Sequence, residues 1–247
     1  MNREQQVSRA FVALSDTFAA EFDPLSLFQN LVRQCVGLLD VTAAGVMLDD
    51  GRGQLRIMAI SGEEAGVLEM LQLQTDAGPC MDCYRTGSPL TVADLSEEAG
   101  RWPGLVPHAL EYGYRSLHTV PLQLQGRVLG AVNLFRTDPG TLDVADQQLA
   151  QAFADISAVA LMHWSVEPAR PEDVLTRMQS VISAKVSLEV AKGMVAQAAD
   201  ISVSEAGELL RDHAAERRMR LSDLVHGLTD GSLSLREVTS GEPEPHI

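Results

Sequence analysis

The sequence predicts an α+β protein with one antiparallel sheet, followed by a separate all-helical region. Three observations predict this: two pairs of apolar runs joined by turn signals, helical periodicity on either side of them, and a proline-containing break before a last helical segment. The order along the chain is helix, hairpin, loop-rich insert, hairpin and helix. The length of 247 residues suits two domains.

The amino-terminal segment has the spacing of helices. Apolar side chains recur every three or four positions, which is a helical period, at Phe11, Leu14, Phe18 and Phe22. Asp23-Pro24 then opens a second helix, because proline suits the first turn of a helix. The apolar face expected for this second helix consists of Leu25, Phe28, Leu31, Val32, Cys35 and Leu38.

Two hairpins are expected after these helices. Residues 43–48 and 55–60 are apolar runs separated by Asp-Asp-Gly-Arg-Gly, which is a strong turn signal. Residues 116–124 and 128–135 flank Gln-Gly-Arg and form the second hairpin. The insert between the hairpins is broken by glycine and proline, so short helices and loops are expected there. A long helix over residues 143–164 follows.

A break in the pattern divides the chain. Residues 166–171 contain two prolines and no periodic pattern, so we interpret them as a linker. The α+β domain before it comprises residues 1–165, and the helical domain after it comprises residues 172–232. Residues 233–247 end in a polar, proline-rich sequence and are predicted to be a disordered tail.

The helical domain begins with a heptad pattern. Apolar residues recur every seven positions, with alanine three positions further on, at Val174, Val181, Leu188 and Val195 and at Ala184, Ala191 and Ala198. Such a seam predicts a coiled-coil segment and favours pairing with a second chain, so a homodimer is expected.

Two shorter helices are expected after the seam. Ser202 and Glu205 have the spacing of a capping box, which predicts a helix over residues 203–214. Residues 221–228 form the last predicted helix, and Asp230-Gly231 ends it, because glycine readily adopts the left-handed conformation of a helix C-cap.

Composition limits the classes of function. The net charge is −15, from 19 basic and 34 acidic residues, so any contact with nucleic acid must be local. No apolar run approaches the ~20 residues of a membrane helix, and the first residues lack an apolar signal core. Three cysteines do not make a disulfide framework, which fits a reducing compartment. We therefore expect a cytoplasmic protein with no membrane contact.

Cys80 and Cys83 stand three positions apart, a spacing that suits metal binding or thiol chemistry, and both are candidate sensor thiols. A tetrahedral zinc site needs two more ligands, and the sequence has no second Cys-x-x-Cys, so no metal is assigned. The alternative is a short helix after Gly78-Pro79 with one thiol packed inward. The sequence has no nucleophile elbow, Walker A or dinucleotide motif, so we predict no catalytic residue and no enzyme.

Lys185 and Lys192 are seven positions apart, so both project from one side of the heptad helix, and Glu189 lies between them. One interpretation is a salt-bridged exposed face. The other is a stripe that contacts phosphates, joined by four arginines from later in the domain, Arg211, Arg217, Arg218 and Arg220. Gly193 costs this helix ~1 kcal/mol relative to alanine, which predicts close approach by another helix or by RNA.

The runs AKVSLEVAKGMVAQ (184–197) and SVSEAGELLRDHAAERRMRLSDLV (202–225) resemble the ANTAR family of RNA-binding antitermination domains, over residues 175–231. That family has a basic residue seven positions before the lysine of an Ala-Lys-Gly, as at Lys185 and Lys192. It often has Asn in place of Arg218 and usually Arg in place of Lys185, so phosphate contacts are better supported than contacts to base edges.

The resemblance implies that paired domains bind tandem RNA stem-loops and prevent a terminator from forming, with no DNA partner. It implies RNA contacts at Lys185, Lys192, Gly193, Arg211, Arg217, Arg218 and Arg220.

The runs GPCMDCYRTGSPLTVADL, RWPGLVPHALEYGYRSLHTVPL and GRVLGAVNLFRTDPGTLDVADQQLAQAFADI lie within residues 1–165. They resemble a GAF sensory domain of the kind that precedes ANTAR in actinobacterial proteins. GAF domains often bind small molecules between the sheet and its covering helices and loops, which implies an unidentified ligand here. The residues Leu134, Leu142 and Gln147 depart from the pattern of the cyclic-nucleotide subset, which counts against that ligand class.

The expected function is therefore a signal-responsive RNA-binding regulator that promotes transcription antitermination. Two alternatives remain open. One is a ligand- or redox-sensing dimeric module whose C-terminal helices bind a protein partner rather than RNA. The other is a small-molecule enzyme in the GAF-like pocket, which requires a paired base and nucleophile that the sequence does not show.

Overall fold

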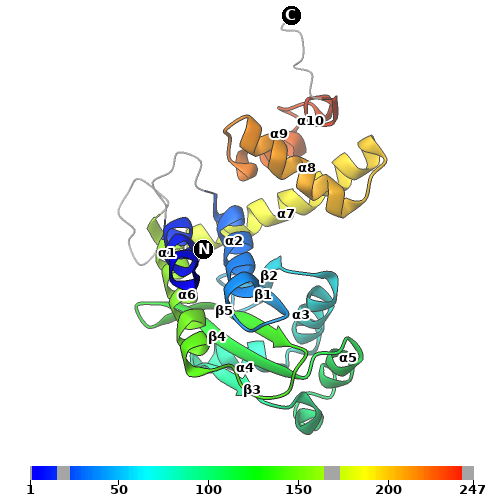
Figure 1. The fold of residues 1–247 in the computed structure, drawn as a ribbon. Coiled ribbons are helices and arrows are strands. Elements are labelled where there is room, and N and C mark those ends of the chain that lie inside the picture. Colours follow the sequence, from blue (N-terminus) through cyan, green and yellow to red (C-terminus); the bar gives the residue numbers. More distant parts are fainter. Residues whose placement is uncertain (1, 16–22, 164–172, 241–247) are drawn as a thin grey trace, which may run out of the picture.

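The computed structural model describes residues 2–15, 23–163 and 173–240 (Figure 1). An antiparallel five-stranded sheet in the order β2-β1-β5-β4-β3 forms the centre of the amino-terminal part. Helices cover both faces of this sheet, and a further group of helices packs beyond one end of it (Figure 1). The expected α+β class with a C-terminal helical region is confirmed.

Both predicted hairpins form. The first joins β1 (Ala43–Asp49) to β2 (Leu55–Ile60), and the second joins β4 (Ser116–Leu124) to β5 (Arg127–Arg136). β1 pairs with β5, which merges the hairpins into one sheet. At that pairing a Cβ on Gly130 would overlap the carbonyl oxygen of Met47, so only glycine fits there. The edge strand β3 (Leu90–Val92) was not expected, because three residues are too few to show a strand period.

The helices form two layers (Figure 1). One face of the sheet is covered by α2 (Pro24–Leu38) and α6 (Val144–His163), and α1 (Arg3–Ser15) packs on these two helices. The other face carries α3 (Glu63–Thr75) and α4 (Pro79–Thr86), and η1 (Leu95–Glu98) and α5 (Val106–Glu111) extend this layer. The apolar face predicted for α2 is buried or half-buried throughout. Phe18 and Phe22 of the predicted first helix lie outside the described residues.

The C-terminal helices are α7 (Asp173–Ala199), α8 (Val203–Glu216), α9 (Leu221–Asp230) and α10 (Leu235–Ser240). The heptad residues Val181, Leu188 and Val195 are at most 7% exposed, although only one chain is present. α7 packs against α8, α9 and α10, so these helices of the same chain fill the seam that we expected a second chain to fill. This seam is therefore not open to a second chain. The side chain of Val174 lies outside the described part.

The helix termini follow local signals. The capping box at α8 forms: the Ser202 hydroxyl accepts from the Glu205 N–H at 3.2 Å, and the Glu205 carboxylate accepts from the Ser202 N–H at 2.9 Å. Gly231 ends α9 with φ 82°, as expected for a glycine C-cap.

The disordered tail predicted from residue 233 needs a correction at its start. Residues 235–240 form α10, because Val238 packs into the C-terminal core and is only 4% exposed. Leu233 and Leu235 pack against the same core. Residues 241–247 of the predicted tail lie outside the described residues, as does the predicted linker 166–171.

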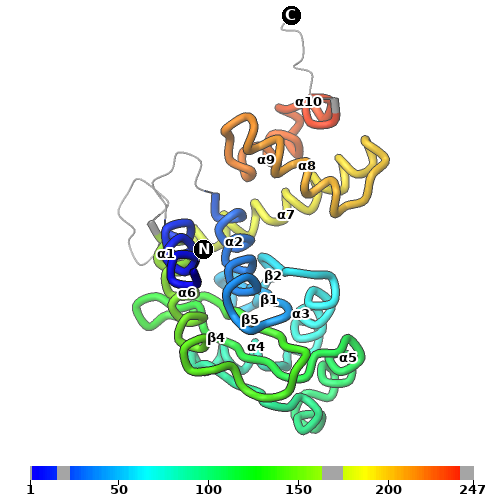
Figure 2. The backbone as a smooth tube through the Cα atoms, viewed as in Figure 1, coloured from blue at the N-terminus to red at the C-terminus, as the bar shows by residue number. Residues whose placement is uncertain are grey.

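The two parts of the chain share one apolar core. The tube in Figure 2 shows α7 passing beside α2, and the large buried cluster runs from α1 and α2 through the sheet into α7, α8 and α9. A Cβ on Gly51, in the β1–β2 turn, would lie 2.7 Å from a methyl group of Leu175 on α7. None of the helices in the described part is both long and apolar enough to cross a bilayer.

Candidate functional site

A buried cluster of polar side chains lies between the sheet and α3. We call Glu69, Gln72, Thr119 and Asn133 the inner polar cluster; none of them is measurably exposed. The Asn133 amide donates to both carboxylate oxygens of Glu69 at 2.7 Å, and the Gln72 amide donates to one of them at 3.0 Å. The Thr119 hydroxyl donates to the Asn133 carbonyl oxygen at 2.8 Å. The cluster therefore joins α3 to β4 and β5.

Glu69 is the ionisable member of this cluster. Burial raises the pKa of Glu69 to about 8, and the hydrogen bond from Asn133 opposes that rise. A Cβ on Gly45 would overlap the Glu69 carboxyl group, so β1 needs a glycine at this point. Burying the Glu69 carboxyl group costs free energy, and the backbone of β1 leaves space for it at Gly45. Buried acid groups with shifted pKa values are found more often at binding sites than in structural cores.

The two candidate sensor thiols adjoin the cluster. Cys80 and Cys83 lie on α4 and both are fully buried, whereas the structural alternative expected only one to pack inward. The side-chain amide oxygen of Gln72 accepts from the Cys80 N–H at 2.9 Å. Burial raises the pKa of Cys83 to about 12, and burial together with the Glu69 charge raises the pKa of Cys80. Protonated, enclosed thiols are weak nucleophiles, so thiol chemistry here requires α4 to move.

The comparisons with known proteins identify the family. The family model described as GAF domain matches residues 23–162. The chain belongs to the GAF domain family. The match ends one residue before the last residue of α6, so it leaves the C-terminal helices outside the GAF domain. No curated protein matches the chain.

Solved structures share the fold at low identity. The GAF domain of the Acinetobacter phosphoenolpyruvate-protein phosphotransferase is 16% identical with a TM-score of 0.53, over 69% of this chain and 100% of that one. The GAF domain of the Coxiella burnetii phosphoenolpyruvate-protein phosphotransferase is 17% identical with a TM-score of 0.50, over 66% and 96%. The reduced form of fRMsr from Staphylococcus aureus is 16% identical with a TM-score of 0.50, over 64% and 94%.

The inner polar cluster thus lies inside the GAF domain, between its sheet and a covering helix. The cluster was missed by sequence reasoning because an acid on a helix usually indicates a solvated face, and its partner Asn133 is 64 positions away. Among the described residues, no group of three or more His, Cys, Asp or Glu side chains is arranged to hold a metal ion.

The basic residues of the C-terminal helices lie outside the GAF domain and form two groups. In the first, Glu189 holds both lysines: its carboxylate oxygens lie 2.7 Å from Lys185 Nζ and 2.9 Å from Lys192 Nζ. Burial would raise the pKa of Glu189, but the hydrogen bonds and charges of the two lysines lower it. The expected ion pairs therefore form, on lysine side chains that are 20–23% exposed rather than fully solvated.

Arg211 joins the first group across the α7–α8 contact. A Cβ on Gly207 would lie 3.1 Å from Cε of Lys192 and 3.5 Å from a guanidinium nitrogen of Arg211. Both cations therefore lie beside Gly207, which is buried in α8. We call Lys185, Lys192 and Arg211 the basic face.

The second group is at the α8–α9 turn. Arg217 ends α8, Arg218 follows it, and Arg220 is the N-cap residue of α9. Arg217 and Arg218 are exposed. The backbone of Arg218 is left-handed, with φ 52°. Asn adopts that conformation more readily than most residues, so the backbone at this position would favour Asn over Arg.

Gly193 is exposed and has open space around it. Apart from its own helix and chain neighbours, none of the described atoms would lie within 4 Å of a Cβ on Gly193, so close packing inside this chain does not explain the glycine. Val186 and Val190 lie on the same side of α7 and are 60% and 50% exposed. Val186, Val190 and Gly193 therefore form an uncovered strip along α7 in the described part of the chain.

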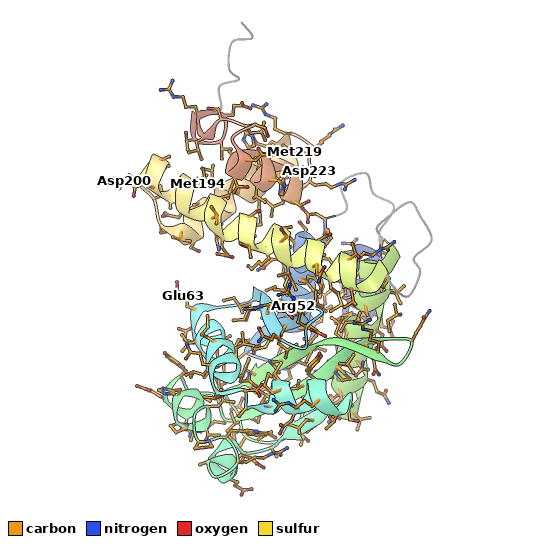
Figure 3. All side chains as sticks on the ribbon, turned by 180° about the vertical axis from the view of Figure 1, so that it is seen from behind. Arg52, Glu63, Met194, Asp200, Met219 and Asp223 are labelled. Carbon is orange, nitrogen blue, oxygen red and sulfur yellow. The ribbon has the colours of Figure 1, made fainter. Side chains whose placement is uncertain are left out.

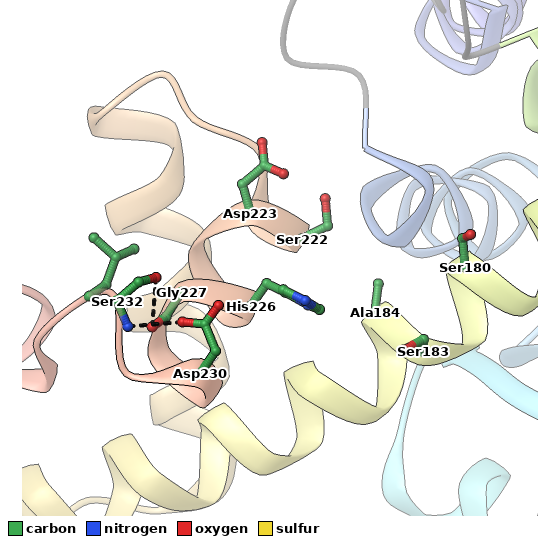
Figure 4. A pocket seen from close by; sticks show the side chains of 10 residues that line it. Ser180, Ser183, Ala184, Ser222, Asp223, His226, Gly227, Asp230 and Ser232 are labelled. Carbon is green, nitrogen blue, oxygen red and sulfur yellow. Dashed lines mark hydrogen bonds between the residues drawn. The ribbon is translucent and has the colours of Figure 1, made fainter.

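A pocket of 540 Å³ opens between α7 and α9 (Figure 4). Ser180 and Ser183 line it on α7, and His226 and Asp230 line it on α9. Ser222 and Asp223, at the start of α9, also line it (Figure 4). The pocket therefore borders the junction with the GAF domain.

Proposed function

We propose that this protein is a signal-responsive RNA-binding regulator. Its GAF domain binds a small molecule, and its helices α7–α9 bind paired RNA stem-loops and promote transcription antitermination. The observation that carries the proposal is the basic face, where Lys192 and Arg211 meet beside Gly207 and Lys185 lies about two helical turns earlier in α7. Clustered cations on a strongly acidic chain are typical of a local phosphate-binding surface.

The proposed action is binding without catalysis. A polar ligand that enters between the sheet and α3 would exchange hydrogen bonds with Glu69 and Asn133, two members of the inner polar cluster. RNA would meet the basic face through its phosphates, while hairpin shape and loop bases set specificity. A homodimer would hold two such surfaces at high effective concentration on tandem stem-loops.

RNA that copurifies with the full chain tests the proposal. We expect its sequences to contain paired stem-loops. Binding of such an RNA should weaken as salt rises, with a log–log slope of about −2 to −3 for three phosphate contacts. Fluorescence anisotropy between 50 and ~300 mM salt measures this slope. The absence of stem-loop affinity at the lowest salt contradicts the proposal.

Replacing Glu189 with Gln should strengthen RNA binding. The neutral amide keeps the size of the side chain but releases Lys185 and Lys192 from a carboxylate within 3 Å of each. Removing one adjacent negative charge is worth ~1 kcal/mol, or about fivefold in affinity. The matched control is Glu111→Gln, which removes the same charge from an exposed residue of α5. Unchanged or weaker binding by Glu189→Gln would show that the lysines do not contact phosphates.

The uncovered side of α7 favours a second candidate function. Val186 and Val190 are exposed as a protein contact would require, and Gly193 leaves room for a second helix. In this candidate the GAF domain senses a ligand or a redox signal, and the C-terminal helices bind a protein partner or a second chain. It predicts no affinity for stem-loop RNA, so the same anisotropy experiment separates the two functions.

A further inference from the structure

The helix α9 begins without a capping side chain of its own. Its N-cap residue is Arg220, whose side chain makes no hydrogen bond to the first turn and has no acceptor atom. The first N–H groups of a helix have no partner inside the helix, and an N-cap oxygen normally satisfies one of them. The N–H of Ser222, in the first turn of α9, is therefore expected to find an acceptor elsewhere.

That acceptor is Asp23, from the other end of the chain. Its Oδ2 accepts from the Ser222 N–H at 2.6 Å. Its Oδ1 accepts from the Leu25 N–H at 2.8 Å, so the same side chain is the N-cap of α2 in the GAF domain. Asp23 is only 3% exposed, which leaves its carboxylate little contact with water.

The charge of Asp23 fits this position. The amino-terminal end of a helix carries a partial positive charge, and here two such ends meet at one carboxylate. Burial raises the pKa of Asp23, and the hydrogen bonds from Ser222 and Leu25 lower it. Asp223 is the neighbouring acid; it pairs with Arg220 at 3.9 Å and is labelled at the start of α9 in Figure 3.

We propose that Asp23 is an interdomain latch, in which one buried carboxylate caps α2 of the GAF domain and α9 of the C-terminal helices, so that a movement of α2 is transmitted to α9. α2 is suited to report on the sensory sheet because it packs on β1, β2 and α6. α9 is suited to receive that movement because its start adjoins Arg217, Arg218 and Arg220. The latch is a property of the folded chain and does not depend on RNA being the partner.

Asp23→Asn tests the latch with a small change. A carboxylate offers two acceptor oxygens, whereas an Asn amide offers one, so the variant can cap only one of the two helices. Asn is itself a strong N-cap and keeps α2 capped. In hydrogen exchange on the full chain, we expect the Ser222 amide to exchange at least about fivefold faster than in the wild type, while the GAF core keeps its protection. Asp23→Ala should expose both the Ser222 and Leu25 amides.

The matched control is Asp94→Asn. Asp94 caps η1 within the GAF domain and accepts from the Ser96 N–H at 2.8 Å, so this variant should leave the exchange of α9 unchanged. Exchange at Ser222 and Leu25 that is the same in Asp23→Asn as in the wild type overturns the latch.

Transmission requires a second comparison. Val32→Ala shortens a buried side chain on α2 about two and a half turns after Asp23. We expect Val32→Ala to speed exchange at Ser222 in the wild-type background and to add nothing in the Asp23→Asn background. If the two substitutions act additively on Ser222, α2 and α9 are not coupled through Asp23, and the transmission is refuted.

Discussion

Lys192→Glu should lower the affinity for paired RNA stem-loops by about 10- to 100-fold, because a charge-assisted hydrogen bond to phosphate contributes ~1.5–3 kcal/mol. The structure favours Lys192 over the other cations for this test. It is the residue of α7 that meets Arg211 beside Gly207, and it stands within the Ala-Lys-Gly on which the ANTAR resemblance rests. Reversal also adds repulsion of phosphate, so this substitution should have the largest effect on binding.

The fold should survive Lys192→Glu. Glu189 keeps its ion pair with Lys185, and the Lys192 side chain lies at the edge of the α7–α8 contact and not within the apolar core. Circular dichroism and the thermal midpoint check this point. The matched control is Arg115→Glu, which reverses the same charge on an exposed residue before β4. Equal loss of affinity in the two variants would indicate a general charge effect and remove the assigned role of Lys192.

Glu69→Gln should change the pH dependence of stability more than any other substitution considered. The pKa of Glu69 is raised to about 8 in the folded chain, against an ordinary value of 4.5. The folded state therefore holds this proton over a range in which the unfolded state has lost it. Below about pH 4.5 the protonated Glu69 makes its full contribution to the free energy of unfolding of the wild type. That contribution is lost as the pH rises toward 8.

The expected size follows from the linkage between protons and folding. A pKa difference of one corresponds to ~1.4 kcal/mol, so the free energy of unfolding should fall by an amount on the order of several kcal/mol between pH 5 and ~8. Glu69→Gln is neutral at every pH and should lack this fall. Urea unfolding at a series of pH values measures the difference between the two proteins.

Glu63→Gln is the control for this experiment. Glu63 begins the same helix, is exposed, and is labelled at the edge of the molecule in Figure 3. Glu63→Gln should therefore show the same dependence of the free energy of unfolding on pH as the wild type. If the free energy of unfolding depends on pH in the same way in the wild type and in Glu69→Gln, the Glu69 carboxyl group is ionised in the folded chain. The inner polar cluster would then hold no proton on Glu69 at neutral pH.

Local patterns predicted most of the secondary structure. The turn of two aspartates and two glycines defined the first hairpin, and Ser202 with Glu205 defined the start of α8, because each signal acts within a few residues. The heptad pattern of α7 correctly predicted a buried seam but assigned it to the wrong partner. A heptad pattern indicates only that one side of a helix is buried, and it does not indicate which element covers that side. Here α8 and α9 of the same chain cover it.

The candidate sites divide in the same way. Lys185, Glu189 and Lys192 could be placed together from the sequence because three- and four-residue spacing on a helix fixes their proximity. Arg211 joins them only through the packing of α8 on α7 at Gly207.

The sequence alone therefore determined the hairpins, the helices and the in-helix pairing of charges, since these depend on residues a few positions apart. The tertiary structure was needed to show that Glu69 is enclosed with Asn133, 64 positions away, and that Asp23 accepts a hydrogen bond from Ser222, 199 positions away in the first turn of α9. Such contacts arise only when distant elements pack and exclude water. The sequence around a single acidic residue does not indicate whether its side chain will be exposed to water or buried.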